Sequence, residues 1–226
     1  PIIKMKVAIL ALLFVVVLSV LIEAKLSNKV RKGFVKALNK YRSKVAKGKA
    51  PNGTSGGKLP KASNMYQVTW SKKLEKKAAK LVKLCNFTTA SSTSGLAAYR
   101  QNGTVKAAAI IKATPKGWWT AFQKYGIPSL TFNNNDTTYR NITSVEDYVH
   151  LLSFVQGIWA KSKEVGCAAA TCTNLTYNYC IFKPGGTNGQ AIYKKGKKLK
   201  CPKGSKKVKK SGLCKVKGKK GKTIHK

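Results

Sequence analysis

The chain has 226 residues, which is enough for one domain with a hydrophobic core and a small appendage. It carries 45 lysine and arginine residues against 6 aspartate and glutamate residues, for a net charge of +39. Only four of the basic residues are arginines, and lysine acts as a mobile point charge, so the composition favours general attraction to polyanions and argues against base-specific recognition of nucleic acid.

Residues 1–24 have the pattern of a secretory signal peptide. Lys4 and Lys6 form a basic start, an apolar run extends from Val7 to Ile22, and Ala24 offers a small residue for cleavage. An uncleaved signal anchor is the alternative, although the run is slightly short for a membrane span. We therefore expect a secreted, extracellular protein, which argues against a nuclear role for the lysine runs.

Four segments have the apolar spacing of amphipathic helices. They are residues 28–48, 70–85, 114–126 and 144–162. In the third segment, Pro115 has the context of a helix start and Gly126 that of a helix end. The fourth segment opens with the sequence SVED, whose acidic residues suit a helix N-terminus. Short β-prone pieces follow in residues 163–186 and end in a Pro-Gly-Gly turn.

These elements predict an α+β fold, with helices and a few late strands in a three-layer αβα domain. We expect the domain to cover residues 25–191. Residues 192–226 form a basic tail, which holds 16 lysines, two cysteines and no acidic residue. The sequence leaves open whether this tail folds, and we expect most of it to be free.

The cysteine content predicts disulfide bonds. Six cysteines follow the signal segment, and an even number in an oxidising compartment favours three bridges. Zinc binding is the alternative, but the chain has no CxxC pair and only two histidines, which argues against it. The six are Cys85, Cys167, Cys172, Cys180, Cys201 and Cys214.

Six Asn-x-Ser/Thr sequons follow the signal segment, which is more than chance would favour. They predict glycosylation on surface loops of a secreted protein. The acceptor residues are Asn52, Asn86, Asn102, Asn135, Asn141 and Asn174.

Four separated motifs carry a resemblance to a known family. Residues 38–42 read LNKYR, and a long loop then ends in PKASNM before Trp70. Residues 153–159 read SFVQGIW and lead to a VGC run. Residues 179–189 read YCIFKPGGTNG. In this order the motifs resemble those of the CAP superfamily (cysteine-rich secretory proteins, antigen 5 and pathogenesis-related proteins), and most of all the secreted antigens of parasitic nematodes.

The resemblance covers about residues 28–195 and implies a CAP αβα sandwich. It also implies a disulfide pairing of Cys85 with Cys172 and of Cys167 with Cys180, which leaves Cys201 to pair with Cys214 in the tail. These pairs are carried over from the family pattern.

The resemblance also implies the loss of a metal site. Many CAP proteins hold a divalent metal with two histidines and two glutamates in a central cleft. The corresponding positions here are Leu38, Gln101, Ala121 and Ser153, which are non-ligating or poor ligands. We therefore expect no metal, no cofactor and no catalysis.

Two residues near the cleft invite a catalytic interpretation that we do not favour. Ser153 has no histidine or carboxylate placed to activate it as a nucleophile. His150 lies one helical turn before Ser153, and a lone histidine on a helix is more often a structural residue than a ligand.

The lysine load favours a non-enzymatic effector that binds anionic glycans, above all sulfated glycosaminoglycans, or a host receptor; no specific nucleic acid is expected. The alternative is that the lysines only keep the protein soluble, but ordinary solvated surfaces mix both signs of charge. The candidate polyanion-binding residues are Lys194, Lys195, Lys197, Lys198, Lys200, Lys206, Lys207, Lys209 and Lys210.

A second hypothesis is a sterol or fatty-acid carrier, because CAP relatives are credited with holding lipids near a loop after the third helix. The matching loop here offers Tyr125, Ile127, Leu130 and Phe132 as apolar contacts. Such residues equally anchor a loop to the core. A lytic role on anionic membranes is disfavoured, since the tail lacks an amphipathic apolar face.

Overall fold

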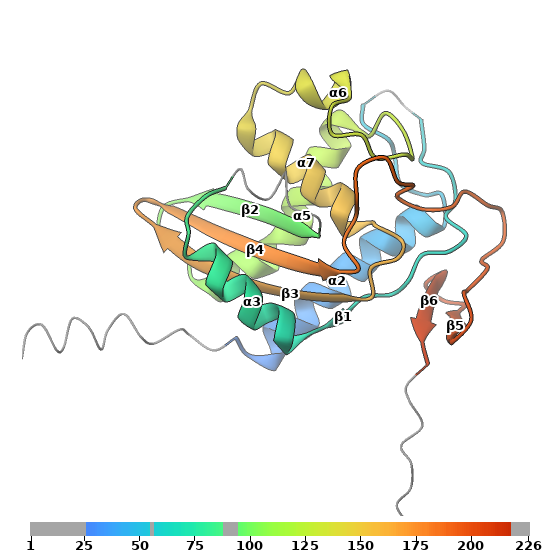
Figure 1. Ribbon diagram of the computed structural model, residues 1–226, viewed down its shortest axis with the longest axis horizontal. Coiled ribbons are helices and arrows are strands. Elements are labelled where there is room, and N and C mark those ends of the chain that lie inside the picture. Colours follow the sequence, from blue (N-terminus) through green and yellow to red (C-terminus); the bar gives the residue numbers. More distant parts are fainter. Residues whose placement is uncertain (1–25, 55–56, 88–94, 218–226) are drawn as a thin grey trace, which may run out of the picture.

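The computed structural model describes residues 26–217, apart from 55–56 and 88–94 (Figure 1). The expected signal peptide and the last part of the tail, residues 218–226, lie outside the described residues. Within the described part, no helix is long and apolar enough to cross a membrane.

The fold is a three-layer αβα sandwich of the α+β class, which confirms the predicted fold class (Figure 1). The central sheet has the order β1-β3-β4-β2, with β1 parallel to β3 and the other pairs antiparallel. Its strands are β1 Thr69–Trp70, β2 Leu96–Asn102, β3 Glu164–Cys172 and β4 Leu175–Lys183.

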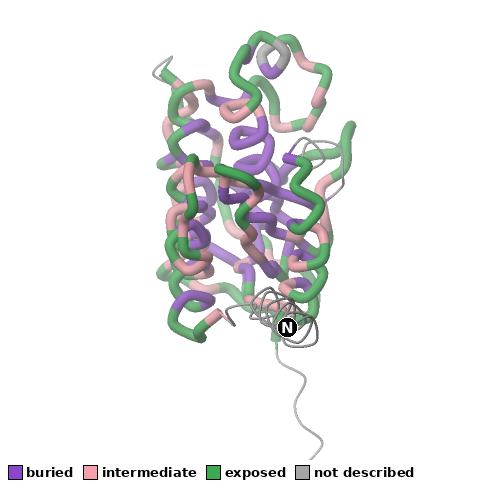
Figure 2. The backbone as a smooth tube through the Cα atoms, turned by 90° about the vertical axis from the view of Figure 1, so that its left-hand side faces the viewer, coloured by how far each residue is buried: buried purple, intermediate pink, exposed green. Residues whose placement is uncertain are grey.

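Helices cover the sheet on both sides. The helix α3 packs on β3 and β4, whereas α5 packs on the sheet from the other side together with α2, and α7 lies along β2 (Figure 1). The buried residues gather in the middle of this arrangement (Figure 2). The helices are α2 Asn28–Ala46, α3 Lys72–Val82, α5 Ala107–Tyr125, the short α6 Thr137–Arg140 and α7 Val145–Gly157.

The prediction that a helix starts at Pro115 is wrong. The helix α5 begins at Ala107, so Pro115 lies inside it and is buried. The alanine-rich turns before the proline have high helix propensity, and Ile110 and Ile111 pack into the core. This packing stabilises a helix that continues through a residue without a backbone N–H group. The end at Gly126 is as predicted.

The strand β2 was absent from the sequence prediction. Its sequence, LAAYRQN, is rich in alanine, which has low β propensity. It becomes a strand because it pairs over its whole length with β4, which lies far away in the sequence.

Three disulfides cross-link the domain, in the same pairs that the resemblance implies. The first joins Cys85, just after α3, to Cys172 at the end of β3. The second joins Cys167 to Cys180, which face each other on β3 and β4. The third, between Cys201 and Cys214, closes a loop in the tail.

The described part of the tail is folded, contrary to the expectation of a mostly free segment. It ends in the hairpin of β5 Ser205–Val208 and β6 Leu213–Val216. Leu213 and Cys214 are fully buried, and Cys214 exchanges backbone hydrogen bonds with Met65 and Gln67. At the expected boundary, Ile192 and Tyr193 are core residues, so the chain enters the tail without a linker.

A buried arginine joins α2 to the segments beside the tail. The guanidinium of Arg42 is fully buried and donates only to backbone carbonyl oxygens, at distances of 2.6 to 3.4 Å. Burial lowers the pKa of Arg42 to about 9, so the group stays charged at neutral pH. The acceptors are the carbonyls of Tyr66, Gly157, Trp159, Ala160 and Ser162.

We expect Arg42→Met to lower the free energy of unfolding by about 3 kcal/mol, because it leaves several buried carbonyls without a donor. The matched control is Lys40→Met on the exposed face of the same helix, with a change within about 0.5 kcal/mol. Urea unfolding with the disulfides intact measures both. An equal fall in the free energy of unfolding of both variants would contradict a special role of Arg42 in holding α2 to the neighbouring segments.

Candidate functional site

A polar hollow of about 350 Å³ lies between β2, α5 and α7. Of the four positions that the resemblance assigns to a metal, only Ala121 lines it. Leu38 and Ser153 are buried, and Gln101 lies near the end of β2 opposite Thr176. The hollow is lined by Tyr99, Ala113, Lys116, Gly117, Thr120, Ala121, Lys124, Glu146, Asp147 and His150.

Ser153 and His150 satisfy the backbone of an edge strand. The strand β2 is at the edge of the sheet, so one row of its N–H and C=O groups has no partner strand. The Ser153 hydroxyl accepts from the Ala98 N–H at 2.8 Å, and His150 Nε2 accepts from the Arg100 N–H at 3.3 Å. Because these two side chains sit one helical turn apart on α7, they match alternate residues of β2.

The surroundings of His150 keep its imidazole neutral. Its ring stacks on Tyr99 with centroids 4.6 Å apart and meets Phe87 edge-on. Burial lowers the pKa of His150 to about 4, and its Nδ1 lies 4.0 Å from Glu146 Oε1. With Nε2 occupied by the Arg100 N–H, the ring has no free lone pair for a metal or a proton transfer.

The two carboxylates of the hollow are also paired. Glu146 accepts from Arg100 Nε at 3.3 Å. Asp147 Oδ2 accepts from Lys124 at 2.8 Å and from the Tyr125 hydroxyl at 2.7 Å. Burial raises the pKa of Asp147, but these hydrogen bonds outweigh it and hold the pKa below its usual value. The polar groups therefore bind one another rather than face an open site.

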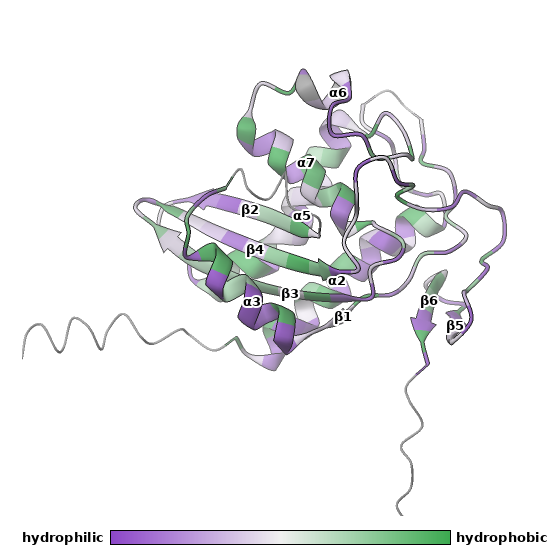
Figure 3. Ribbon diagram, viewed as in Figure 1, coloured by the Kyte–Doolittle hydropathy of each residue, from purple (hydrophilic) through white to green (hydrophobic). Residues whose placement is uncertain are grey.

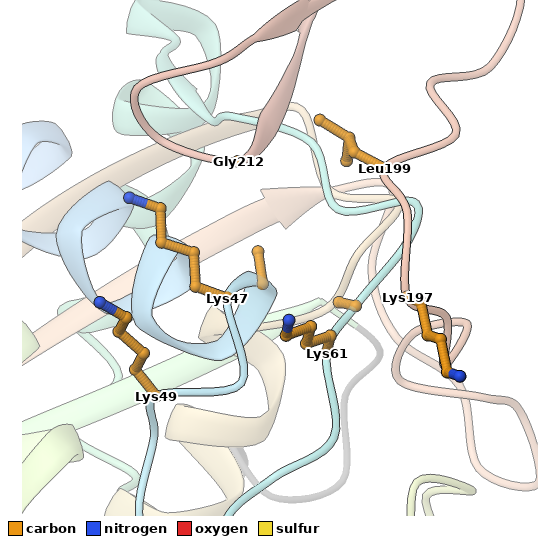
Figure 4. A pocket seen from close by; sticks show the side chains of 8 residues that line it. Lys47, Lys49, Lys61, Lys197, Leu199 and Gly212 are labelled. Carbon is orange, nitrogen blue, oxygen red and sulfur yellow. The ribbon is translucent and has the colours of Figure 1, made fainter.

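The basic residues form a different kind of surface. All nine tail lysines expected to bind polyanions are exposed, and the connection that carries them to β5 and β6 is mostly hydrophilic (Figure 3). A second hollow of about 320 Å³ lies where the tail meets the domain (Figure 4). It is lined by Ala46, Lys47, Lys49, Lys61, Ala62, Lys197, Leu199 and Gly212.

Only Lys197 of this second hollow was predicted from the sequence. Lys47, Lys49 and Lys61 were missed, because they join the site only when the tail folds back on the end of α2. A further groove lies among exposed lysines of α3. Its residues are Lys72, Lys73, Lys76, Lys77 and Lys80, whose helical spacing was visible in the sequence.

The family is decided by comparison with known proteins. The model of the cysteine-rich secretory protein family, CAP, matches residues 35–183, which is more than half of the chain. The chain belongs to the CAP family. This confirms the resemblance, and the matched segment of the CAP domain runs from α2 to the end of β4.

Similar proteins include nematode secreted proteins and venom allergens. The Ancylostoma secreted protein of Ancylostoma caninum is 27% identical over 200 residues, covering 84% of this chain and 45% of that protein. A venom allergen 5 of Polybia scutellaris rioplatensis is 29% identical over 166 residues, covering 70% of this chain and 75% of that protein.

The fold is also similar to those of solved nematode proteins. Na-ASP-1 superposes with a TM-score of 0.68 at 25% identity, over 85% of this chain and 48% of that one. NaASP2 with Zn²⁺ superposes with a TM-score of 0.66 at 26% identity, over 85% of this chain and 98% of that one. The chain thus spans about half the length of the Ancylostoma protein and of Na-ASP-1.

The residues at the four positions that the resemblance assigns to a metal do not fit a metal ion. Leucine and alanine at positions 38 and 121 supply no donor atom, and the Ser153 oxygen is committed to the backbone of β2. Within the described ranges, no three or more His, Cys, Asp or Glu side chains are grouped to hold a metal. The side chains of Ser153 and His150 serve instead as acceptors for N–H groups of the edge strand β2.

The sequons of the CAP domain divide into two kinds. Asn52 forms a clamp, since its Nδ2 donates to the Ile127 carbonyl at 3.0 Å and its Oδ1 accepts from the Ile127 N–H at 2.8 Å. Its side chain therefore joins two loops. The other five acceptor asparagines are exposed, namely Asn86, Asn102, Asn135, Asn141 and Asn174.

The expected lipid loop packs on the core. Ile127 is buried, and Leu130 and Phe132 are partly buried against the same core. Phe132 meets Tyr139 and Trp159 edge-on. These contacts are those of a loop anchored to the domain, and they do not favour the lipid-carrier hypothesis.

We expect His150 to make stability depend on pH. Its folded pKa of about 4 lies below its ordinary value of 6.5, so the unfolded chain binds the extra proton first as pH falls. Stability from this group is complete above pH 6.5 and is lost between pH 6.5 and 4, by up to about 3 kcal/mol. Urea unfolding across this range measures the loss.

The matched variant is His150→Gln, in which the loss over the same range should be much smaller. The lowered pKa of Asp147 acts mainly below this range, so it does not mask the effect. An imidazole titration of His150 centred near pH 6.5, or an unchanged loss in the variant, would contradict this account.

Proposed function

We propose that this CAP protein is secreted and acts without catalysis, by binding sulfated glycosaminoglycans on host cells or matrix. The observation that carries the proposal is that residues 192–217, the described part of the tail, are folded with their lysines exposed. The tail sequence, residues 192–226, has no acidic residue. Binding to a polyanion releases its condensed counterions, so such a surface binds strongly at low salt.

The order of the tail supports this proposal over a merely solvated appendage. Its backbone is held to the domain by several hydrogen bonds, including those from Lys200 N–H to Ser63 and from Ser63 N–H to Lys194. Lysines on a fixed backbone lose less conformational freedom on binding than lysines on a free chain. The described part of the tail thus presents its lysines on a backbone that is hydrogen-bonded to the domain.

The relatives and the cleft support the other parts of the proposal. The name of the Ancylostoma protein describes that protein as secreted. In this chain, the histidine, serine and carboxylates of the cleft are engaged with one another or with β2, which leaves no activated nucleophile or base there.

We expect the wild-type protein to elute from immobilised heparin well above physiological salt, about 0.15 M. A variant in which the hairpin lysines Lys206, Lys207, Lys209 and Lys210 are each changed to Gln should elute at lower salt. It makes fewer contacts with the polyanion, so its binding releases fewer counterions. Deleting the tail is a poorer test, since this would uncover the surface beneath Leu213.

The matched control removes four charges from α3, with Lys72, Lys73, Lys76 and Lys77 each changed to Gln. It lowers the net charge equally and leaves the tail intact. An equal fall in both variants would mean that net charge, and not the tail, sets the binding. Elution of the wild type near physiological salt would contradict the proposed function itself.

A further inference from the structure

The hollow between the domain and the tail brings together lysines from three separate segments. Lys47 and Lys49 follow α2, Lys61 lies in the next loop, and Lys197 lies in the tail. In Figure 4 the ammonium groups of Lys47, Lys49 and Lys61 are turned to the same side, whereas that of Lys197 points away. Lys47, Lys49 and Lys61 are called the seam lysines below.

The tail holds Lys47 in place. A Cβ atom at Gly212 would lie only 3.5 Å from Lys47 Cγ, so the aliphatic part of Lys47 packs against the tail at a residue without a side chain. The Lys47 ammonium then donates to the Lys210 carbonyl at 2.7 Å. An ammonium group has three N–H donors, so two remain for a ligand.

A glycine also holds Lys61. Gly48 has a φ of +64°, and a Cβ atom there would lie 2.8 Å from Lys61 Cγ. The stem of Lys61 therefore crosses the chain between Lys47 and Lys49. The Lys61 carbonyl accepts from the Gly196 N–H of the tail at 2.9 Å, and this bond joins the backbone of Lys61 to the tail. The positions of Lys47 and Lys61 thus both depend on the docked tail.

No acidic residue lies close in the sequence to the residues that line the hollow. Residues 24–74 and 165–226 contain no aspartate or glutamate, and these two stretches supply the whole lining of the hollow. None of the ion pairs found among the described residues involves a seam lysine. An anion placed there would relieve the mutual repulsion of the three ammonium groups.

The last backbone carbonyls of α2 are already occupied by backbone N–H groups. The carbonyl end of a helix carries a partial negative charge, but the carbonyls of Ser43, Lys44 and Val45 accept from the N–H groups of residues 47, 49 and 48. Ala46, Ala62 and Leu199 add an apolar wall to the hollow.

We propose that the seam lysines seat one sulfo group of the bound glycan, with its sugar ring against the apolar wall. The inference rests on the proposed function and names its site, which is a composite of domain and tail. A volume of about 320 Å³ is at the low end of the range for small-molecule sites. The same chemistry would also accept free inorganic sulfate.

The experiment compares a seam variant, Lys49→Gln with Lys61→Gln, with a control variant, Lys73→Gln with Lys77→Gln on α3. Both remove two exposed charges. Binding of a sulfated heparin hexasaccharide is titrated at several salt concentrations. The slope of log affinity against log salt should fall by about 2 in the seam variant, one unit for each lost contact, and by much less in the control.

A second arm uses inorganic sulfate against chloride at matched ionic strength and follows the thermal midpoint. Sulfate is excluded from protein surfaces and stabilises all three proteins to a similar degree. Binding at the seam adds to this, so sulfate should raise the midpoint of the wild type and of the control variant by more than that of the seam variant. This arm does not depend on the glycan.

The outcomes separate the two proposals. Tight hexasaccharide binding with equal slopes in both variants would overturn the seat and leave the proposed function standing. A seam-dependent sulfate effect without hexasaccharide binding would uphold an anion seat and overturn the proposed function. A sulfate effect as large in the seam variant as in the control variant would overturn the seat in either case.

Discussion

The arrangement of this molecule depends on one buried charge without a carboxylate partner. The Arg42 guanidinium binds the Tyr66 carbonyl and the carbonyls that follow α7, so it fixes the relative positions of α2 and two connecting segments. Residues 65–67 are also where Cys214 docks. Because the tail packs on a backbone that Arg42 holds, the lysine-lined hollow depends indirectly on the same group.

The polar side chains of α7 beside β2 have a structural role. The side chains of His150 and Ser153 cap two N–H groups of the edge strand β2, and Trp118 donates to the Ala98 carbonyl between them. A buried N–H without an acceptor costs about 1–3 kcal/mol, so these residues have a sufficient structural reason to be present. Their presence near the cleft does not require a catalytic role.

Two features of the structure offset the repulsion among its many positive charges, namely the disulfides and the exposure of the lysines. Self-repulsion at a net charge of +39 opposes folding, and three disulfides counter it by restricting the unfolded chain. The lysines of residues 192–217 and those of the α3 groove are exposed, so water and salt screen them. The same placement leaves them available to a polyanion.

The sequence by itself determined the fold class, the family and the extents of α2 and α3 to within a few residues, because these depend on residue spacing and identity. Only the tertiary structure decided that β2 is a strand, that α5 continues through Pro115, and that the tail folds back on α2. Each of these depends on contacts between residues that are far apart in the chain. Local propensity favoured the wrong state at β2 and Pro115, and packing against distant segments outweighed it.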